Sequence, residues 1–459
     1  MRALPAPRPD RAAITARPMP AYRDPWEERL LADPWALSAI AAKVGGPFHL
    51  LNPDRVRSNI RAFRDVFAKH RLDGAIYYGK KANKARCVVH ACAETGAGVD
   101  VSSAGELGAA LAGGVRGVDL VVTGPAKSTE LLRLAAAHNA LIAIDDPEEL
   151  ERLRATTLSA RILLRVLPPG STSRFGMTDT ELRDALTHLT GTRIRLEGYS
   201  FHLTGYEIAD RAELATALIG RVLEARRLGH PAEIISIGGG FGVNYVPEQA
   251  WRTFLEEVNP LWFHGDRAFD ASTFYPYHFS TPGPAMLAAV LQHGGLGKRL
   301  RDHHIRLAIE PGRALLDRAG STVFTVQGVK TRDVDGTAYD IVTVNGSSLS
   351  LSEQWFATEY LPDPVLWTRR PPADNDELTP TCVGGTTCLD DDMLSWRRIP
   401  LPRPAKIGDL LIYPNTAGYQ MDSNESRFHE LPIPPKIILR EAENGRQFLW
   451  ELDSDASRI

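Results

Sequence analysis

Cysteine is scarce in this sequence, with four residues in 459. Four scattered thiols are too few for the disulfide framework of a secreted protein, and none forms the CxxC pair typical of zinc sites. We therefore expect a cytoplasmic protein without a metal site. The cysteines are Cys87, Cys92, Cys382 and Cys388.

Long apolar runs and a strong net charge are also missing. No stretch reaches eighteen uninterrupted apolar residues, and the Pro- and Arg-rich start lacks the apolar core of a secretory signal. The 53 Lys and Arg residues nearly balance the 56 Asp and Glu residues, which leaves a formal net charge of -3. Such a charge favours neither nucleic acid nor an anionic membrane as a partner. We therefore expect the partner of this protein to be a small molecule.

The sequence does contain a regular alternation of two kinds of segment. Short apolar or β-branched runs alternate with longer segments of helical periodicity, and there are eight such repeats. Eight strand–helix repeats are the signature of a (β/α)8 barrel of the α/β class, whereas an open doubly wound sheet of this size would be unusual. The expected strands are 75–79, 98–101, 118–123, 140–144, 161–166, 195–201, 233–237 and 306–309.

The two ends of the chain differ from this central part. Residues 1–25 are rich in proline, arginine and alanine, which predicts a disordered or loosely docked extension, with a helical patch at 26–44 and folded structure from Phe48 onward. After Arg313 the expected strands follow one another without helices, which indicates a C-terminal mainly-β domain. These strands are 321–329, 339–344, 409–413 and 436–439. The expected domains are an extension over 1–45, a barrel over 46–315 and a β domain over 316–459.

A long interruption separates the seventh and eighth expected strands of the barrel, at about 246–300. It includes an aromatic-rich run at 262–279. A segment of this length in a compact domain is usually functional or an interaction element. A plain surface excursion with its own small core explains it equally well, and the sequence leaves both interpretations open.

Polar residues follow nearly every expected strand of the barrel. Lys80 and Lys81 follow the first strand, His202 follows the sixth, and Glu310 follows the eighth. Barrels of this type carry their chemistry at the carboxyl ends of the strands. We therefore expect these side chains to belong to one site.

A phosphate site is expected after the last two strands. Gly238, Gly239 and Gly240 follow the seventh strand, and Arg313 comes shortly after the eighth. Glycine N–H groups can approach an anion closely, and an arginine supplies a planar charged fork. A glycine run alone is more often a tight turn, but barrels frequently bind phosphate with the loops in this position.

A lysine beside such a site suggests one particular cofactor. Most lysines are solvated surface charges, and a lysine alone would carry no argument. Pyridoxal 5'-phosphate, however, needs a Schiff-base lysine, a phosphate cradle, a carboxylate for its ring nitrogen and a flat group against the ring. Glu310 and His202 complete that set, although strand periodicity does not choose between Lys80 and Lys81.

Seven separated motifs, in order and at matching spacing, resemble those of the fold type III, or alanine-racemase-fold, pyridoxal-phosphate-dependent amino-acid decarboxylases, such as the diaminopimelate and ornithine decarboxylases. The similarity spans residues 46–435. The motifs are Tyr78-Gly-Lys-Lys-Ala-Asn83 with Gly98-Val-Asp-Val-Ser-Ser-Ala-Gly-Glu-Leu107, Ser173-Arg-Phe-Gly176, His202, Ile237-Gly-Gly-Gly-Phe241, Glu310-Pro-Gly-Arg313, Gly385-Thr-Thr-Cys388 and Asn415-Thr-Ala-Gly-Tyr419.

The resemblance implies a role for each matching residue. Lys81 would form the Schiff base, His202 would stack on the ring, and Glu310 would pair with the ring nitrogen. The residues implied to hold the phosphate are Gly238, Gly239, Gly240, Gly312, Arg313 and Tyr419.

The resemblance also implies a head-to-tail homodimer with a shared active site. Cys388 of one subunit would enter the site of the other and act as the proton donor. A residue pair across the interface, Arg174 with Asp392, is also implied, although an exposed ion pair would contribute little to stability.

The carboxylate implied for the ring nitrogen favours decarboxylation over racemisation. A Glu there keeps the nitrogen protonated, so the ring can accept the electrons left at the α-carbon after carbon dioxide departs. Racemases of the same fold are expected to have an Arg in that place. Two alternatives remain open, namely an amino-acid racemase or epimerase, and a non-catalytic cofactor-binding regulatory protein.

The sequence departs from the family pattern at positions that bear on the substrate. The residue after the catalytic Cys is acidic in decarboxylases of basic amino acids, but here it is Leu389, followed by Asp390. We therefore expect free lysine and ornithine to be poor substrates, and a larger or conjugated amino acid to reach the aromatic run near Phe274, Tyr275 and Tyr277. A second departure is Thr204, which could contact the phosphate where the family has Gly and then Ser.

Overall fold

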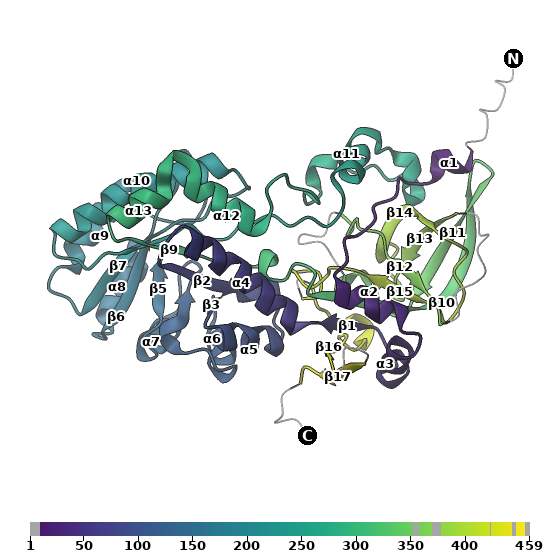
Figure 1. The fold of residues 1–459 in the computed structure, drawn as a ribbon, viewed down its shortest axis with the longest axis horizontal. Helices are drawn as coiled ribbons and strands as arrows, with labels where there is room; N and C mark the ends of the chain where they lie inside the picture. The colour runs from purple at the N-terminus through teal and green to yellow at the C-terminus, as the bar shows by residue number, and fades with distance from the viewer. Residues whose placement is uncertain (1–9, 352–357, 370–377, 423, 443–446, 455–459) are drawn as a thin grey trace, which may run out of the picture. The chain divides into compact units, whose positions relative to one another are not determined.

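The computed structural model describes residues 10–351, 358–369, 378–422, 424–442 and 447–454 (Figure 1). The chain divides into two compact units, which are described separately below. The barrel unit comprises Val56–Gly242 and Thr281–Leu315, and the β unit comprises Met1–Arg55, Val243–Ser280 and Leu316–Ile459.

Eight parallel strands form a closed barrel in the barrel unit, each paired with the next and the last with the first. This confirms the fold predicted from the eight repeats. The strands are short and almost entirely buried, as expected for a parallel sheet covered on its outer face by helices. They are β2 (Gly74–Gly79), β3 (Gly98–Val101), β4 (Leu120–Val122), β5 (Leu141–Ile144), β6 (Ala160–Arg165), β7 (Ile194–Ser200), β8 (Ile234–Ser236) and β9 (Arg306–Ile309).

Helices connect consecutive barrel strands, and their starts follow local sequence signals. Asp146 caps the N-terminus of α8 with Pro147 in the first turn, and Thr178 with Glu181 forms a capping box at α9. The helices of this part of the chain are α4 (Pro53–Lys69), α5 (Arg86–Thr95), α6 (Ala104–Ala112), α7 (Thr129–Ala137), α8 (Pro147–Ala155), α9 (Asp179–Leu189), α10 (Ile208–Arg227), α12 (Gly283–Gln292) and α13 (Leu296–Asp302).

A nine-stranded sheet is the centre of the β unit. Its main path runs β14-β13-β11-β10-β1-β16-β17, and β15 joins β10 to β12. The strands are β1 (Phe48–Leu51), β10 (Gly320–Val334), β11 (Thr337–Val344), β12 (Val365–Trp367), β13 (Thr379–Gly384), β14 (Met393–Leu401), β15 (Leu410–Tyr413), β16 (Lys436–Glu441) and β17 (Phe448–Leu452).

Five of these strands were not expected from the sequence, namely β1, β12, β13, β14 and β17. Pro380 lies within β13 and argues against a central strand, because proline cannot donate to a strand ladder. In the structure Pro380 pairs with Pro400 of β14, and the register is irregular between Thr381 and Val383. The sheet therefore accommodates the proline at an irregular part of the ladder, which local sequence preference does not reveal.

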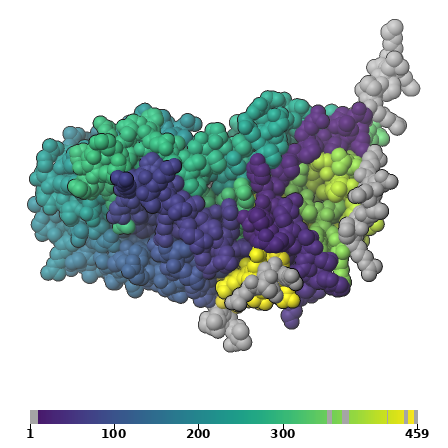
Figure 2. Space-filling view, viewed as in Figure 1, coloured from purple at the N-terminus to yellow at the C-terminus, as the bar shows by residue number. Residues whose placement is uncertain are grey.

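The N-terminal segment of the described chain is part of the β unit. Ile14 and Met19 are fully buried, and the backbone N–H of Met19 donates to Asp363 Oδ2 at 2.6 Å. Figure 2 shows this purple segment lying against the green C-terminal part of the same unit. The prediction of a disordered or loosely docked extension is therefore wrong for residues 10–24, because apolar side chains spaced between the prolines enter the core; residues 1–9 lie outside the described residues.

Helices α2 (Pro25–Ala32) and α3 (Ala36–Val44) also contribute to the core of the β unit. Trp26, Leu30 and Ile40 pack with apolar residues of β1, β10 and β16. Folded structure therefore begins well before Phe48, contrary to the prediction. The helical patch expected at 26–44 is confirmed as these two helices, which are separated by Asp33-Pro34-Trp35.

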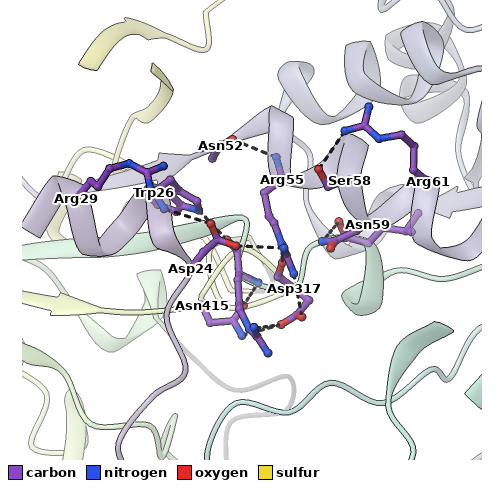
Figure 3. A network of polar contacts seen from close by, with 12 residues as sticks. Asp24, Trp26, Arg29, Asn52, Arg55, Ser58, Asn59, Arg61, Asp317 and Asn415 are labelled. Atoms are coloured by element: carbon purple, nitrogen blue, oxygen red, sulfur yellow. Dashed lines mark hydrogen bonds and ion pairs between the residues drawn. The ribbon is translucent and has the colours of Figure 1, made fainter. Parts of the chain in front are cut away.

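A polar network fixes the start of α2 within the β unit (Figure 3). Asp24 Oδ1 accepts from the N–H of Trp26 at 3.2 Å, and Asp24 Oδ2 pairs with Arg55 Nη1 at 3.1 Å. Asn415 Nδ2 donates to Asp317 Oδ1 at 3.1 Å, and Arg55 Nη2 lies 3.8 Å from Asp317 Oδ2. Segments near residues 24, 55, 317 and 415 are thereby held together.

The aromatic-rich run belongs to the β unit and builds a core there. The ring centroids of Tyr245 and Tyr277 lie 5.6 Å apart, and those of Tyr245 and Tyr360 lie 5.8 Å apart. Phe274 and Tyr277 are 5% and 0% exposed, so neither offers its ring to a substrate. The suggestion that these two rings bury part of the substrate is therefore wrong, and the interpretation of an excursion with its own core is the one that fits.

None of the helices formed by the described residues is long and apolar enough to cross a membrane.

Glu27 gives the β unit a testable pH dependence. Burial raises the pKa of this carboxyl from 4.5 to about 7, against the opposing hydrogen bond from the Ser321 hydroxyl. The folded state therefore binds a proton that the unfolded chain releases above pH 4.5, so stability falls as the pH rises from 4.5 to 7. Glu27→Gln should raise the free energy of unfolding by about 2 to 3 kcal/mol at pH 8 and change it little at pH 4.5.

Urea unfolding of the wild type and the variant at both pH values would measure this difference. Glu28→Gln is the matched control, because the neighbouring Glu28 side chain is 53% exposed and should give no comparable gain. An equal effect of Glu27→Gln at pH 4.5 and pH 8 would contradict the assignment.

Candidate active site

A cavity of about 630 Å³ opens at the carboxyl ends of the barrel strands. Strands β3, β4, β6 and β7, and the turns that follow them, supply most of its wall. The lining residues are Lys81, Asp100, Ser102, Thr123, Gly124, Pro125, Ala143, Arg165, Pro168, Pro169, Gly170, Ser171, Ser173, Phe175, Ser200, Phe201, His202, Leu203, Thr204 and Glu310.

Lys81 lies in a short 3-10 turn, Lys80–Ala82, directly after β2. Its side chain lines the cavity, whereas Lys80 is buried and does not contribute to the lining. The tertiary structure therefore distinguishes two adjacent lysines that the strand pattern could not.

His202 follows β7 and lies in the cavity wall. One side of its ring borders the cavity, and protein atoms enclose the rest. This enclosure removes water from the imidazole and, together with the positive charge of Lys81, lowers the pKa of His202 to about 3. The Nδ1 atom accepts the N–H of Gly239 at 3.4 Å, which requires an unprotonated nitrogen at that position. The imidazole is therefore neutral.

The glycine triplet packs against His202 and Glu310 so closely that side chains would not fit. A Cβ atom on Gly238 would lie 2.7 Å from His202 Nδ1, and one on Gly239 would lie 2.7 Å from the carbonyl oxygen of Glu310. Gly238 and Gly240 have φ values of +68° and +79°, which glycine adopts without strain. Arg313 begins the turn Arg313–Leu315 that follows β9, and it is buried.

Glu310 directly follows β9 and lines the cavity. Its Oε1 accepts the hydroxyl of Ser236 at 2.6 Å. Burial raises the pKa of the Glu310 carboxyl, while Ser236, Arg165 and Lys81 counteract this effect. A cationic group bound next to Glu310 would therefore be favoured, because it would stabilise the ionised carboxylate.

Asp100 is a cavity residue that the sequence reasoning did not select. It lies in β3 and accepts the Thr123 hydroxyl at 2.6 Å. Burial and the nearby Glu310 raise the pKa of this carboxyl to about 7, and Lys81 counteracts them. The sequence did contain a signal for Asp100, because an acidic residue stands between two valines in a short apolar strand. A charged side chain is rarely buried in such a strand unless it has a specific role.

Arg165 was also missed, and it is held in place by a buried ion-pair chain. Its Nη1 lies 3.2 Å from Asp145 Oδ1, while Glu149 accepts the N–H of Asp145 at 2.7 Å and pairs with Lys127 at 2.9 Å. The side chains of Lys127 and Glu149 are 1% and 0% exposed. Because Arg165 is an ordinary last residue of an apolar strand, the sequence contained no strong signal for it.

The cavity residues fit pyridoxal phosphate. Two carboxyls and a lysine face the same cavity, and the glycine triplet packs directly against two of the cavity residues, His202 and Glu310. Within the described chain, the buried Ser200 Oγ has no hydrogen-bond partner although it lines this space. Fold and site together are those of a barrel protein whose cavity could hold a phosphorylated aldehyde cofactor beside a lysine.

Comparison with known proteins agrees with this class. Residues 53–271 match the family model of the pyridoxal-dependent decarboxylase, pyridoxal binding domain. The chain is 38% identical to the uncharacterized protein y4yA of Sinorhizobium fredii over 88% of this chain and 90% of that protein. It is 26% identical to the diaminopimelate decarboxylase of Actinosynnema pretiosum over 88% of this chain and 86% of that enzyme.

Solved structures of similar fold include the diaminopimelate decarboxylase of M. jannaschi, with a TM-score of 0.72, 18% identity and 91% coverage of both chains. Another is the Vibrio vulnificus lysine/ornithine decarboxylase complexed with putrescine, with a TM-score of 0.69, 20% identity, and coverage of 91% of this chain and 99% of that one. The protein belongs to the fold type III pyridoxal-phosphate-dependent amino-acid decarboxylases, and it is a carboxy-lyase with pyridoxal phosphate as its cofactor.

Four of the remaining expected site residues lie in the β unit. Cys388 is exposed in the turn after β13, and its Sγ lies 3.1 Å from His429 Nε2. Leu389 and Asp390 follow it and are also exposed. Tyr419 has a backbone φ of +79°, which is strained for an aromatic residue.

Asp392 is buried within its own turn of the β unit. Its carboxylate accepts from the N–H of Ser348 at 2.7 Å and from the N–H and hydroxyl of Thr387 at 3.1 and 2.7 Å. These bonds fix the segment that carries Cys388. Arg174, in the barrel unit, stacks on the ring of Phe175 at 4.4 Å, and its pairing with Asp392 of a partner stays a prediction.

The glycine triplet can be tested by adding one methyl group. In Gly239→Ala the new Cβ would lie 2.7 Å from a backbone carbonyl oxygen that cannot yield, so the triplet must shift. We expect the affinity of the apoprotein for pyridoxal phosphate to fall at least about tenfold. Gly108→Ala in α6 is the control, because a Cβ there meets nothing within 4 Å, and its affinity should equal that of the wild type.

Proposed function

We propose that this enzyme removes the α-carboxylate of an amino acid or an amino-acid conjugate, with Lys81 as the residue that holds the cofactor. The observation that carries the proposal is the cavity that brings Lys81, His202 and Glu310 together. When bound, pyridoxal phosphate supplies an acceptor for the electrons left at the α-carbon after carbon dioxide departs.

Each cavity residue then has a chemical task. The neutral ring of His202 offers a flat face for stacking, and it adds no positive charge that would compete with a protonated ring nitrogen. Glu310 would hold a proton on that nitrogen, with Ser236 fixing its Oε1. Lys81 can form the covalent link because it lies on the wall of the same cavity.

The phosphate is assigned to the loops after β8 and β9. Gly238, Gly239 and Gly240, together with Gly312 and Arg313, would provide its cradle. The donor N–H of the triplet would be that of Gly240, because those of Gly238 and Gly239 donate to Ser236 and His202. Thr204 lines the same cavity and adds a hydroxyl. The strained backbone of Tyr419 supports a functional role for that residue as well, which we take to be a phosphate contact.

Protonation of the α-carbon after loss of carbon dioxide is assigned to the partner subunit's Cys388 in a head-to-tail homodimer. Cys388 is exposed at the surface of the β unit, as a residue that serves another subunit must be. His429, 3.1 Å from its Sγ, can exchange a proton with the thiol. The bonds of Asp392 to Thr387 and Ser348 would keep this segment in place.

The substrate class is inferred from Leu389. This side chain is 49% exposed, follows Cys388 directly and cannot accept a hydrogen bond. An unpaired substrate ammonium beside it would cost on the order of several kcal/mol in a dry site. We therefore assign a conjugated or polar amino acid as the substrate, in preference to free lysine or ornithine.

The shared site predicts recovery of activity from two inactive variants. Lys81→Ala and Cys388→Ala should each be inactive, but a mixed dimer has one site with both groups intact. Random subunit exchange should restore about one quarter of wild-type carbon dioxide release, because half of the dimers are mixed. The measurement is activity against mixing ratio, with exchange demonstrated by differently tagged subunits.

No recovery despite exchange would place Cys388 in its own subunit's site or outside the chemistry. Borohydride reduction of the holoprotein followed by peptide mapping serves as an independent control. The cofactor should be found on Lys81, and a label on Lys80 would contradict the lysine assignment.

The substrate assignment predicts a specific order of kcat/KM values. Free ornithine, lysine, arginine and diaminopimelate should lie at least about a hundredfold below citryl- or acyl-conjugated diamino acids. Leu389→Glu should improve the free basic amino acids, because the new carboxylate can pair with a distal ammonium. Carbon dioxide release and chiral analysis of the product would be measured together.

Efficient turnover of unmodified basic amino acids by the wild type would show that another acid, such as Asp390, serves the distal amine. An inverted amino acid without carbon dioxide release would instead indicate racemisation and would overturn the proposed reaction.

A further inference from the structure

Arg211 is a fully buried arginine in the first turns of α10. Its guanidinium donates to the carbonyl oxygens of Gly239 and Ile237 through Nη1, and to that of Gly205 through Nη2 at 3.3 Å. Two of these carbonyls belong to the segment that carries the glycine triplet, and the third belongs to the turn after His202. Arg211 thus joins the segment of the glycine triplet to the turn that follows His202.

This cation has no anionic partner in the part of the chain that the structure describes. No carboxylate there forms an ion pair with Arg211, and its Nε atom has no hydrogen-bond partner. Desolvation lowers the pKa of the guanidinium to about 10, so it still carries its charge at neutral pH. A buried charge compensated only by carbonyl dipoles is costly, and an anion bound nearby would reduce that cost.

The contact with Gly239 also fixes the direction of one backbone donor. The peptide between Gly239 and Gly240 is planar and trans, so its carbonyl and its N–H point in opposite directions. Because the carbonyl faces Arg211, the N–H of Gly240 is turned away from Arg211. A Cβ on Gly240 would lie 2.9 Å from Nη2, so the guanidinium also fills the space that a side chain would need.

We propose that Arg211 is a positioning residue that gives the site its preference for a phosphorylated cofactor, by holding the glycine triplet in its donor orientation and supplying a buried positive charge behind it. The proposal rests on the proposed function in one respect, namely that the phosphate binds at the triplet. Arg211 itself does not touch the phosphate in this arrangement. Its contribution is to the charge and geometry of the residues that do.

The test compares the affinity of the apoprotein for pyridoxal phosphate and for pyridoxal, which lacks the phosphate. Both bind through the same aldehyde, so the ratio of the two Kd values reports the phosphate site. We expect Arg211→Gln to weaken pyridoxal phosphate at least about tenfold and pyridoxal less than about threefold. Arg211→Lys keeps the positive charge but loses the planar, two-pronged guanidinium. It should therefore weaken pyridoxal phosphate less than Arg211→Gln does, and again more than it weakens pyridoxal.

Arg226→Gln provides a matched control at the other end of α10. Arg226 also donates to three backbone carbonyls, those of Ala232 at 2.6 Å, His303 at 2.7 Å and His304 at 3.0 Å. Its loss should lower the melting temperature without changing the ratio of the two Kd values. If Arg211→Gln does not fold, Arg211→Lys carries the comparison.

Equal losses for both ligands in the Arg211 variants would indicate a merely structural residue and would overturn the proposal, as would unchanged binding of pyridoxal phosphate. Failure of the proposed phosphate site gives a different result. In that case the wild type itself would bind pyridoxal as tightly as pyridoxal phosphate.

Discussion

Closure of β2 to β9 into a parallel barrel is the constraint on which the site depends. Closure brings the carboxyl ends of all eight strands to one face, so residues more than two hundred positions apart, such as Lys81 and Glu310, line the same cavity. The strands themselves are short and mostly apolar, and the polar cavity residues lie near their carboxyl ends or in the turns that follow them. The helices between the strands fix these turns, because each begins with its own capping residues or packs on the barrel.

The electrostatics of the cavity follow from this convergence. Two carboxyls, Asp100 and Glu310, are brought close together and desolvated, which raises the pKa of both. The cations Lys81 and Arg165 oppose this effect, and Arg165 is itself held by Asp145. Such a balance favours binding of a group that is cationic at one atom and anionic at another, as a protonated pyridine bearing a phosphate is.

The core of the β unit is built differently from that of the barrel, because its buried residues come from segments that are far apart in the sequence. The N-terminal helices, the aromatic run and the C-terminal strands all contribute buried side chains to it. Each of these segments is short and has only a weak hydrophobic periodicity. Its apolar residues become buried only when the segment packs against the others. This explains why residues 10–24 looked like an extension, and why Phe274 and Tyr277 looked like candidates for a substrate pocket.

The sequence by itself determined the barrel, because strand and helix periodicities are local properties that eight repeats reinforce, and it located the glycine triplet, His202 and Glu310 at strand ends. It did not reveal Asp100, Arg165 or Arg211, and its strand pattern did not distinguish Lys80 from Lys81. Those assignments depend on which side chain faces the cavity and which charge is left without a partner, and both depend on contacts between residues far apart in the chain. Only the tertiary structure decides such contacts, because no local pattern encodes the desolvation that gives a buried charge its effect.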